Sequence, residues 1–438
     1  MNLQECNLLR RRIFFPLFLT QFCGAFNDNA FKLSMLTLIS YYLTKSQSAS
    51  EYYQVIASAL FIFPFFIFSA TAGQLADKYD KATLTRIIKF SELLLMLTGS
   101  FGLLHGNIVV MMLVLMGMGL HSTFFGPIKY AILPDHLLQE QLLPATALIE
   151  ASTFMAILLG TTLGALAIGS TGKAPVYSIV LINGLAITGL VASFFIPKAP
   201  SISADLKIDW QVWRSTKAML QITFNNRAVL PVVLSISWFW LIGAVLLTKL
   251  PDYVHYVLNA DTTVFALFLA LFSIGIALGS LAISRFLAGL ITVRYVPLAM
   301  LLLSLFAFDI YWATPIEIFD TRKELLSFLS FLFSLNHLRI VLDFFLFSFC
   351  GGLFIVPLYT YLQVSCEDKR RARVIAANNI VSAVAMVSGS VLVMVMMKLK
   401  LTIAFVFLVL AVCNAIAAVL FWFTAKTKVI HHRSASLG

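Results

Sequence analysis

Long apolar stretches constrain the fold of this chain more than any other feature. Each runs for about 20 residues or more, the length that a helix needs to cross the hydrocarbon core of a bilayer. The stretches are continuous and do not alternate with polar residues, which excludes a membrane β-barrel. Hydrophobic residues make up 60% of the 438 residues and charged residues 12%, so too few polar side chains remain to cover a soluble globule. We therefore predict an all-α polytopic membrane protein.

Twelve transmembrane helices are expected, in two six-helix halves. The first six lie near 15–43, 52–75, 83–104, 108–133, 142–168 and 175–196, and the second six near 229–257, 262–287, 291–313, 339–363, 374–397 and 401–424. We predict an N-terminal bundle over 1–196, a cytoplasmic linker over 197–227, a C-terminal bundle over 228–425 and a cytoplasmic tail over 426–438. No small-residue cleavage site follows the first apolar stretch, so we expect that stretch to be retained. The short apolar segment within 314–338 is interpreted as an interfacial helix.

Basic residues predict the orientation. Most of the 31 lysine and arginine residues fall on the side that holds both termini, so the positive-inside rule places the termini in the cytoplasm. The net charge of +11 is then a topology signal that needs no nucleic-acid partner, and attraction to anionic membrane lipids follows from it. In the linker, Trp210 and Trp213 lie among Lys207, Arg214 and Lys217, a pattern typical of an amphipathic helix at a membrane interface.

Polar residues interrupt the first expected span at its centre: Gln21, Asn27, Asp28, Asn29 and Lys32. A charged side chain there costs roughly 2.5–3.5 kcal/mol, so such groups normally face a protein interior or a wet cavity. Two interpretations stay open. Asp28 and Lys32 are four residues apart and can form a structural ion pair, or the polar stripe lines a central cavity that handles a polar or charged cargo.

Polar groups in other expected spans are candidates for the same cavity. They are Lys129, Glu150, Lys249, Asn378 and Asn379. Lys249 is favoured because it is a buried base in the first helix of the second half, as Asp28 is a buried acid in the first helix of the first half.

Other membrane-embedded polar groups are interpreted as structural. Glu92 follows Lys89 by three residues and Asp343 follows Arg339 by four, spacings that suit local ion pairs. His121 is interpreted as a packed neutral histidine. The five cysteines form no CxxC pair, and no nucleophile, metal-ligand or phosphate-loop pattern is present. We expect no cofactor, no metal and no enzymatic activity.

The turn between the second and third spans reads GQLADKYDKATLTR, from Gly73 to Arg86. Glycine permits a tight backbone at a helix end, and an acid followed by bases can clamp a turn against neighbouring helix ends. This order resembles the loop motif of the major facilitator superfamily, which implies a gating role for Gly73, Asp77, Lys78, Lys81 and Arg86. The alternative is an ordinary solvated turn. The corresponding turn of the second half, GSLAISRF, lacks the acid, which puts its gating role in doubt.

A short internal repeat supports two matched halves. PIKYAIL at 127–133 corresponds to PLYTYLQ at 357–363, and the same displacement of 230 residues carries Ala147 onto Ala377. Repeats of this kind relate the halves of major facilitator transporters, whose substrate site lies between the halves near the middle of the membrane. The expected fold is therefore that of the major facilitator superfamily.

Four segments resemble the lysophospholipid transporter family: FLTQFCGAFNDNAFK (18–32), FFGPIKYAILPDHL (124–137), GGLFIVPLYTYLQ (351–363) and RARVIAANNI (371–380). They resemble still more the transporter half of proteins that fuse this module to an acyltransferase and an acyl-carrier-protein synthetase. The resemblance implies flipping of lysophospholipids, notably lysophosphatidylethanolamine, to the inner leaflet of the bacterial inner membrane for reacylation. It implies a substrate role for Asp28, and a separate acyltransferase/acyl-ACP synthetase as partner because no such domain is expected in this chain.

The charges suit such a cargo. Asp28 can accept the ammonium group, Lys249 or Lys32 the phosphate, and Asn27 and Asn29 the glycerol oxygens. Two other functions stay open. A proton-coupled exporter of drugs or metabolites commonly carries an arginine in the fourth helix, and 108–133 has none. The second alternative is a membrane scaffold that recruits a lipid-remodelling enzyme through the basic linker.

Overall fold

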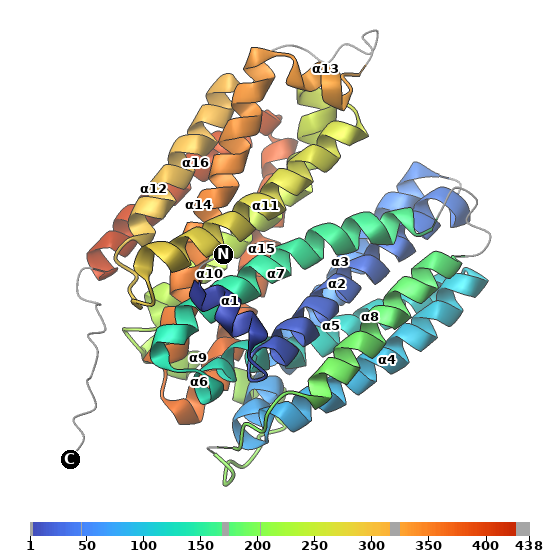
Figure 1. The fold of residues 1–438 in the computed structure, drawn as a ribbon. Coiled ribbons are helices and arrows are strands. Elements are labelled where there is room, and N and C mark those ends of the chain that lie inside the picture. Colours follow the sequence, from blue (N-terminus) through green and yellow to red (C-terminus); the bar gives the residue numbers. More distant parts are fainter. Residues whose placement is uncertain (1–2, 45, 169–174, 202, 316–324, 426–438) are drawn as a thin grey trace. The chain divides into compact units, whose positions relative to one another are not determined.

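The computed structural model describes residues 3–44, 46–168, 175–201, 203–315 and 325–425. These residues are almost entirely helical (Figure 1), and the predicted all-α membrane fold is confirmed. Eleven helices in the described part of the chain are long and apolar enough to cross a membrane. The twelfth long helix is α2, Phe15–Leu38, whose centre carries the polar residues discussed above. The predicted tail at 426–438 lies outside the described residues.

The first half of the chain contains α1 to α8. A short helix α1, Leu3–Arg10, precedes α2, which continues as a π-helical turn over Ile39–Leu43. The next helices are α3 (Gln47–Lys78), α4 (Lys81–His105), α5 (Ile108–Ala131), α6 (Leu133–His136), α7 (Gln139–Leu166) and α8 (Val176–Phe194). Asp80 and Asn107 begin α4 and α5, because their side chains accept the N–H groups of Thr83 and Val110.

The second half contains α9 to α16. The linker helix α9 spans Val212–Asn225, and α10 spans Leu230–Asp252 with a π-helical turn over Tyr253–Val257. The remaining helices are α11 (Thr262–Leu287), α12 (Val296–Ala313), α13 (Phe328–Leu332), α14 (Leu335–Ser365), α15 (Arg371–Lys398) and α16 (Ile403–Ala425). A 3₁₀ turn at Asp368–Arg370 precedes α15.

The helices fall into two compact units. Unit 1 comprises Met1–Leu138, Leu148–Asn226 and Cys366–Val384, and unit 2 comprises Gln139–Ala147, Arg227–Ser365 and Ala385–Gly438. In unit 1, α3 packs on α5, α4 packs on both α5 and α8, and α2 packs on α8 (Figure 1). A continuous hydrophobic core joins them, with Phe31, Met35, Met96 and Met118 all fully buried.

Unit 2 repeats this packing order. Here α11 packs on α14, α12 packs on both α14 and α16, and α10 packs on α16. The short helix α13 is left out, and the six long helices from α10 to α16 are matched in order to the six spans of the first half. The packed pairs of unit 2 then correspond to the packed pairs of unit 1. Pro127 of α5 and Pro357 of α14, which the sequence repeat aligns, both lie inside the matching helices.

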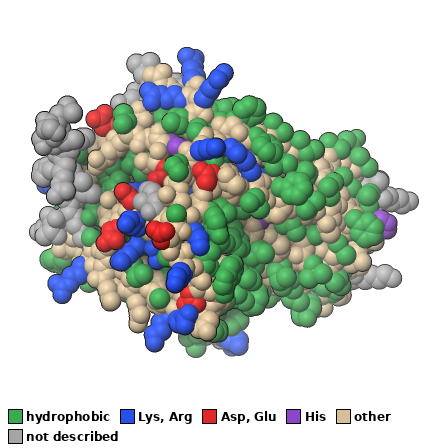
Figure 2. Space-filling view, turned by 90° about the horizontal axis from the view of Figure 1, so that it is seen from below, with side chains coloured by type: hydrophobic (Ala, Val, Ile, Leu, Met, Phe, Trp, Pro, Cys, Tyr) green, Lys and Arg blue, Asp and Glu red, His purple; other side chains and the backbone are tan. Residues whose placement is uncertain are grey.

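The linker helix α9 lies against α3. Its inner side places Met219 and Leu220 on Ala70 of α3 and Ala376 of α15, whereas Trp213 is 87% exposed. This arrangement accords with an amphipathic helix that keeps its tryptophan free for the membrane interface. Figure 2, seen from below, shows basic and acidic side chains gathered beside a broad hydrophobic surface.

Candidate functional site in unit 1

Asp28 lies in the middle of α2 with one carboxylate oxygen unpartnered. Its Oδ2 accepts a hydrogen bond of 2.5 Å from the Ser122 hydroxyl of α5. Its Oδ1 is shielded from solvent and has no hydrogen-bond partner among the described residues. A buried carboxylate oxygen without a donor is costly, so Asp28 is poised to accept a further donor or cation.

Lys32 follows one turn later on α2 and is half-buried. Of the two interpretations left open, the i,i+4 ion pair with Asp28 is absent, because no ion pair joins Lys32 to any carboxylate among the described residues. Asn29 is also half-buried, and its side-chain amide donates a hydrogen bond of 2.8 Å to the Ala25 carbonyl. Helix α2 therefore presents a carboxylate and an ammonium group that do not neutralise each other.

A fully buried charged network lies next to Asp28. Lys89 and Glu92 of α4 are 0% exposed and their Nζ and Oε2 atoms are 2.6 Å apart. His121 Nε2 lies 3.0 Å from the same Oε2, and Asn27 donates to Oε1 at 2.9 Å. The predicted local pair of Lys89 and Glu92 is thus present. Both side chains lie inside the bundle, completely shielded from solvent.

His121 extends this network toward Asp28. Sequence reasoning interpreted it as a packed neutral side chain, but its ring contacts Glu92 and interacts electrostatically with Asp28. The ring also stacks on Phe125 one turn later in α5. No spacing along one helix predicts these contacts, because His121 lies on α5 and its two partners lie on α4 and α2.

Lys129, Tyr130 and Glu150 form a second polar group. The Tyr130 hydroxyl of α5 donates to Glu150 Oε1 on α7, and Glu150 is 1% exposed. Lys129 Nζ lies 4.8 Å from the centre of the Tyr130 ring and interacts electrostatically with Glu150 and Asp28. Tyr130 thereby joins two predicted site residues, Lys129 of α5 and Glu150 of α7.

Asn378 and Asn379 bring α15 to the same unit. Asn378 is fully buried, and neither its amide nitrogen nor its oxygen has a hydrogen-bond partner among the described residues. Asn379 lies against α5, since a Cβ placed on Gly126 would be 2.8 Å from its Nδ2. Unpartnered buried amides in a membrane protein mark a polar site.

The predicted gating turn is joined to the start of α15. Asp77 of α3 is 4% exposed and accepts hydrogen bonds from Arg373 Nε at 2.8 Å and from the Ala372 N–H at 3.0 Å. A carboxylate at a helix N-terminus is stabilised by the free N–H groups there. Gly73 is needed one turn earlier, because a Cβ would come within 2.8 Å of Arg373 Cα. We call this contact between Asp77 and the first turn of α15 the latch.

Other residues of the turn extend the latch. Lys81 Nζ lies 2.8 Å from Asp135, which also accepts from Arg371 of α15 at 3.2 Å. Arg86 donates to three carbonyls at the end of α8, the shortest at 3.2 Å on Ile196. Lys78 instead lies over the Tyr79 ring. The sequence does not predict the partners Arg373 and Arg371, which are almost 300 residues away in the chain.

Lys249 belongs to unit 2 and differs from the expectation of an isolated buried base. Its Nζ lies 2.8 Å from Asp252 in the last turn of α10, and the two side chains are 20% and 41% exposed. Arg339 also differs, because its ion pair is with Asp309 of α12 and not with Asp343. Of the predicted cations, Lys32 and Lys129 belong to the same unit as Asp28.

The family model for the Major Facilitator Superfamily matches residues 17–323. The chain belongs to this superfamily. Solved structures share its fold: the human organic anion transporter MFSD10 (TETRAN) has a TM-score of 0.69 with 15% identity, covering 95% of this chain and 99% of that one. The proton:xylose symporter XylE has a TM-score of 0.72 with 12% identity, covering 96% of each chain.

Among sequences of this superfamily, the chain is similar to bacterial proteins named lysophospholipid transporter LplT. The protein of Photorhabdus laumondii is 27% identical over 376 residues, 84% of each chain. That of Serratia proteamaculans is also 27% identical, with 84% of each chain covered. That of Escherichia fergusonii is 27% identical over 83% of this chain and 81% of the relative.

Proposed function

We propose that this superfamily member transports lysophospholipids across the bacterial inner membrane by alternating access. The similarity to LplT proteins over 84% of the chain supports this substrate class. The observation that carries the proposal is the pair of unneutralised charges on α2: Asp28 has an unpartnered oxygen, and Lys32 has no carboxylate partner among the described residues.

The charges match a zwitterionic head group. Asp28 binds the ammonium of lysophosphatidylethanolamine, and Lys32 or Lys129 binds the phosphate. Glu150 holds Tyr130 and Lys129 in place, and Asn27, Asn29, Asn378 and Asn379 supply hydrogen bonds to the glycerol oxygens. Lys249 has a smaller part in this proposal than in the expectation from sequence, because Asp252 already neutralises it.

The finer steps are also proposals. The cargo moves from the outer to the inner leaflet, both termini lie in the cytoplasm, and a separate acyltransferase/acyl-ACP synthetase then reacylates the product. The latch of Asp77 and Arg373, together with Lys81, holds the cytoplasmic ends of α3 and α15 together in one state of the cycle, and Arg86 fastens the same turn to the end of α8. The latch opens when the substrate is released.

A transport assay tests the site. Purified protein in liposomes is given fluorescent lysophosphatidylethanolamine, and its movement between leaflets is followed by quenching. We expect Asp28→Asn to lower the rate at least tenfold, because an amide cannot neutralise the ammonium group. The matched control Asp252→Asn removes a carboxylate from the exposed end of α10 and should stay within twofold of the parent. Undiminished flipping by a folded Asp28→Asn protein contradicts the proposal.

Two lysine variants decide which base binds the phosphate. Lys32→Gln should lower transport at least fivefold while the melting temperature stays the same or rises, because the variant removes an uncompensated charge from the membrane. Lys249→Gln should leave transport within twofold. If Lys249→Gln lowers transport at least fivefold and Lys32→Gln leaves it within twofold, Lys249 and not Lys32 binds the phosphate.

The cargo series separates the alternatives. Lysophosphatidylethanolamine, lysophosphatidylcholine and diacyl phosphatidylethanolamine are compared with and without a proton gradient. Movement of the one-tailed lipids without a gradient supports the proposal. Uptake that requires the gradient indicates a proton-coupled exporter, and the absence of any movement indicates a scaffold.

A further inference from the structure

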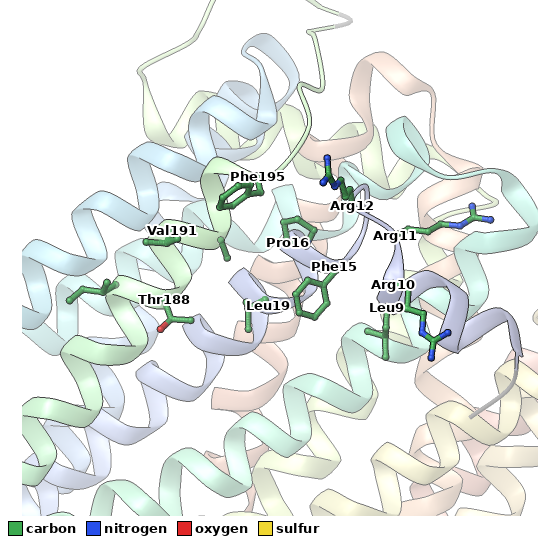
Figure 3. A pocket seen from close by; sticks show the side chains of 12 residues that line it. Leu9, Arg10, Arg11, Arg12, Phe15, Pro16, Leu19, Thr188, Val191 and Phe195 are labelled. Atoms are coloured by element: carbon green, nitrogen blue, oxygen red, sulfur yellow. The ribbon is translucent and has the colours of Figure 1, made fainter.

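A cavity at the start of α2 is lined by three consecutive arginines. It has a volume of about 670 Å³, within the range of small-molecule sites, and lies at the N-terminal end of α2, whereas Asp28 lies at the middle of that helix. Arg10 ends α1, and Arg11 and Arg12 form the turn into α2. Figure 3 shows these arginines on the turn, with Phe15 and Leu19 between them and the end of α8.

The turn that carries the arginines is fixed in place. The Arg11 carbonyl accepts the N–H groups of Phe14 and Phe15 at 3.1 and 3.0 Å. Leu8 and Phe14, on either side of the arginines in the chain, anchor this turn because they are buried, with exposed fractions of 2% and 1%. A pre-formed site loses less conformational entropy on binding than a mobile segment does.

The wall of the cavity is apolar and open to lipid. Phe15 of α2 is 44% exposed, and Val191 and Phe195 at the end of α8 are 51% and 69% exposed. The wall is thus formed by the first residues of α2 and the last residues of α8, at the ends of two long apolar helices. A ligand here can place an acyl chain along this wall while its head group stays at the membrane surface.

The charge at the cavity has one sign. All three arginines are exposed, and none forms an ion pair with a carboxylate whose side chain the structure describes. The lining residues whose side chains the structure describes include no acid. Guanidinium groups bind phosphate oxygens in pairs of hydrogen bonds, and an ammonium group would find no partner here.

We propose that this cavity binds an anionic diacyl phospholipid, with its phosphate on the Arg10–Arg12 turn and one acyl chain between α2 and α8. The ligand is a resident lipid of the leaflet on the N-terminal side of the membrane and is distinct from any transported cargo. It fastens α1 and the first turn of α2 to the end of α8. The site does not involve Asp28 and does not depend on the proposed transport function.

Native mass spectrometry of the full-length, delipidated protein in detergent tests the site. The protein is titrated with dioleoyl phosphatidylglycerol, with dioleoyl phosphatidylethanolamine and with glycerol phosphate. We expect the phosphatidylglycerol complex to be at least fivefold tighter than the other two. Equal binding of phosphatidylethanolamine, or binding of glycerol phosphate as tight as that of the lipid, overturns the proposal.

Matched variants place the binding. The triple variant Arg10→Gln, Arg11→Gln, Arg12→Gln should weaken phosphatidylglycerol binding at least fivefold. The control Lys198→Gln, Lys207→Gln, Lys217→Gln removes three exposed charges that do not line the cavity and should stay within twofold. Val191→Trp fills the cavity from a lipid-exposed position, so it tests the site even if the triple variant fails to fold. Asp28→Asn should bind the lipid normally, and unchanged binding in both cavity variants refutes the site.

Discussion

At the scale of single residues, two acids in unit 1 have opposite environments. Glu92 is fully enclosed and is satisfied by Lys89, His121 and Asn27. Among the described residues, Asp28 keeps one oxygen without a donor and has Ser122 as the single hydrogen-bond partner of the other. A buried ion network in which every polar atom has a hydrogen-bond partner rigidifies its surroundings, whereas a buried oxygen without a donor can bind a ligand. We therefore predict that Glu92 serves stability, in contrast to the substrate role proposed for Asp28.

Glu92→Gln should destabilise the protein severely. The variant leaves Lys89 as an uncompensated charge in the bundle, and breaking a buried pair in this way costs about 3–5 kcal/mol. We expect a large drop in the melting temperature in detergent. The double variant Lys89→Met, Glu92→Gln removes both charges and should recover most of the loss and retain transport. If the double variant is stable but inactive, the network serves transport and not only stability.

At the scale of helices, close contact between α2 and α7 fixes the helix that carries Asp28. Gly160 and Gly164 of α7 face α2, and a Cβ on Gly164 would come within 2.7 Å of Ala30 Cα. Ser34 of α2 adds a hydrogen bond of 2.8 Å to the Gly164 carbonyl and accepts one of 2.5 Å from Ser178 of α8. Small residues that permit such close backbone contact are typical of membrane helix interfaces.

Gly164→Ala should lower stability by about 1–3 kcal/mol, because the added methyl group forces α7 away from α2. Transport should fall as well, since Asp28 shifts with α2. Gly184→Ala of α8 is the matched control: nothing lies within 4 Å of its added Cβ, and alanine favours a helix over glycine by up to about 1 kcal/mol. Thermal unfolding and the transport assay compare the two. Equal melting temperatures would show that the interface tolerates the methyl group.

The helices themselves were predictable from sequence, whereas their partners were not. Each span is a long apolar stretch, so its existence follows from length and hydropathy, and its ends differ by a few residues where polar caps such as Asp80 set them. Asp28 was found because one charge in an apolar stretch is conspicuous. Its neighbour Ser122 lies 94 residues away, and sequence spacing reveals only partners three or four residues apart on one helix.

The same limit explains the errors. A pair of Lys32 with Asp28 was one of two interpretations and a pair of Arg339 with Asp343 was predicted, because the spacing along one helix allows both. In the structure Arg339 pairs across helices with Asp309, since packing of α12 on α14 brings that carboxylate nearer. The spacing predicts that Lys89 pairs with Glu92. Only the packing of α4 on α5 shows that this pair is fully buried.

At the scale of the whole molecule, the proposed transport cycle requires the latch to open and close. The latch places the Asp77 carboxylate against Arg373 and the free N–H of Ala372 at the start of α15. Cys366 lies just before this turn, is 8% exposed, and interacts electrostatically with Asp77 and Arg371. Burial raises the pKa of the Cys366 thiol to about 12, with Arg371 lowering it in part. This cysteine is therefore a native reporter of the latch.

Asp77→Asn should open the latch and expose Cys366. The thiolate is the reactive form, so the raised pKa and the enclosure both keep labelling slow at pH 7–8 while the latch is closed. Opening returns the pKa toward about 8.5, and the rate of labelling by a water-soluble maleimide should rise at least tenfold in that pH range. The measurement uses a variant that keeps Cys366 and replaces the other four cysteines.

The matched control for this measurement is Asp205→Asn, which removes an exposed linker carboxylate and should leave labelling unchanged. Transport separates opening from unfolding. An Asp77→Asn protein with an unchanged melting temperature, fast labelling and at least fivefold slower transport has lost the closed state, because an amide accepts the Ala372 N–H but cannot neutralise Arg373. Exchanging the charges, Asp77→Arg with Arg373→Asp, should restore part of the slow labelling, whereas the N–H contact at the α15 terminus stays lost. If Asp77→Asn leaves labelling of Cys366 as slow as in the parent, the carboxylate does not hold α15 to α3, and the gate must lie elsewhere in the protein.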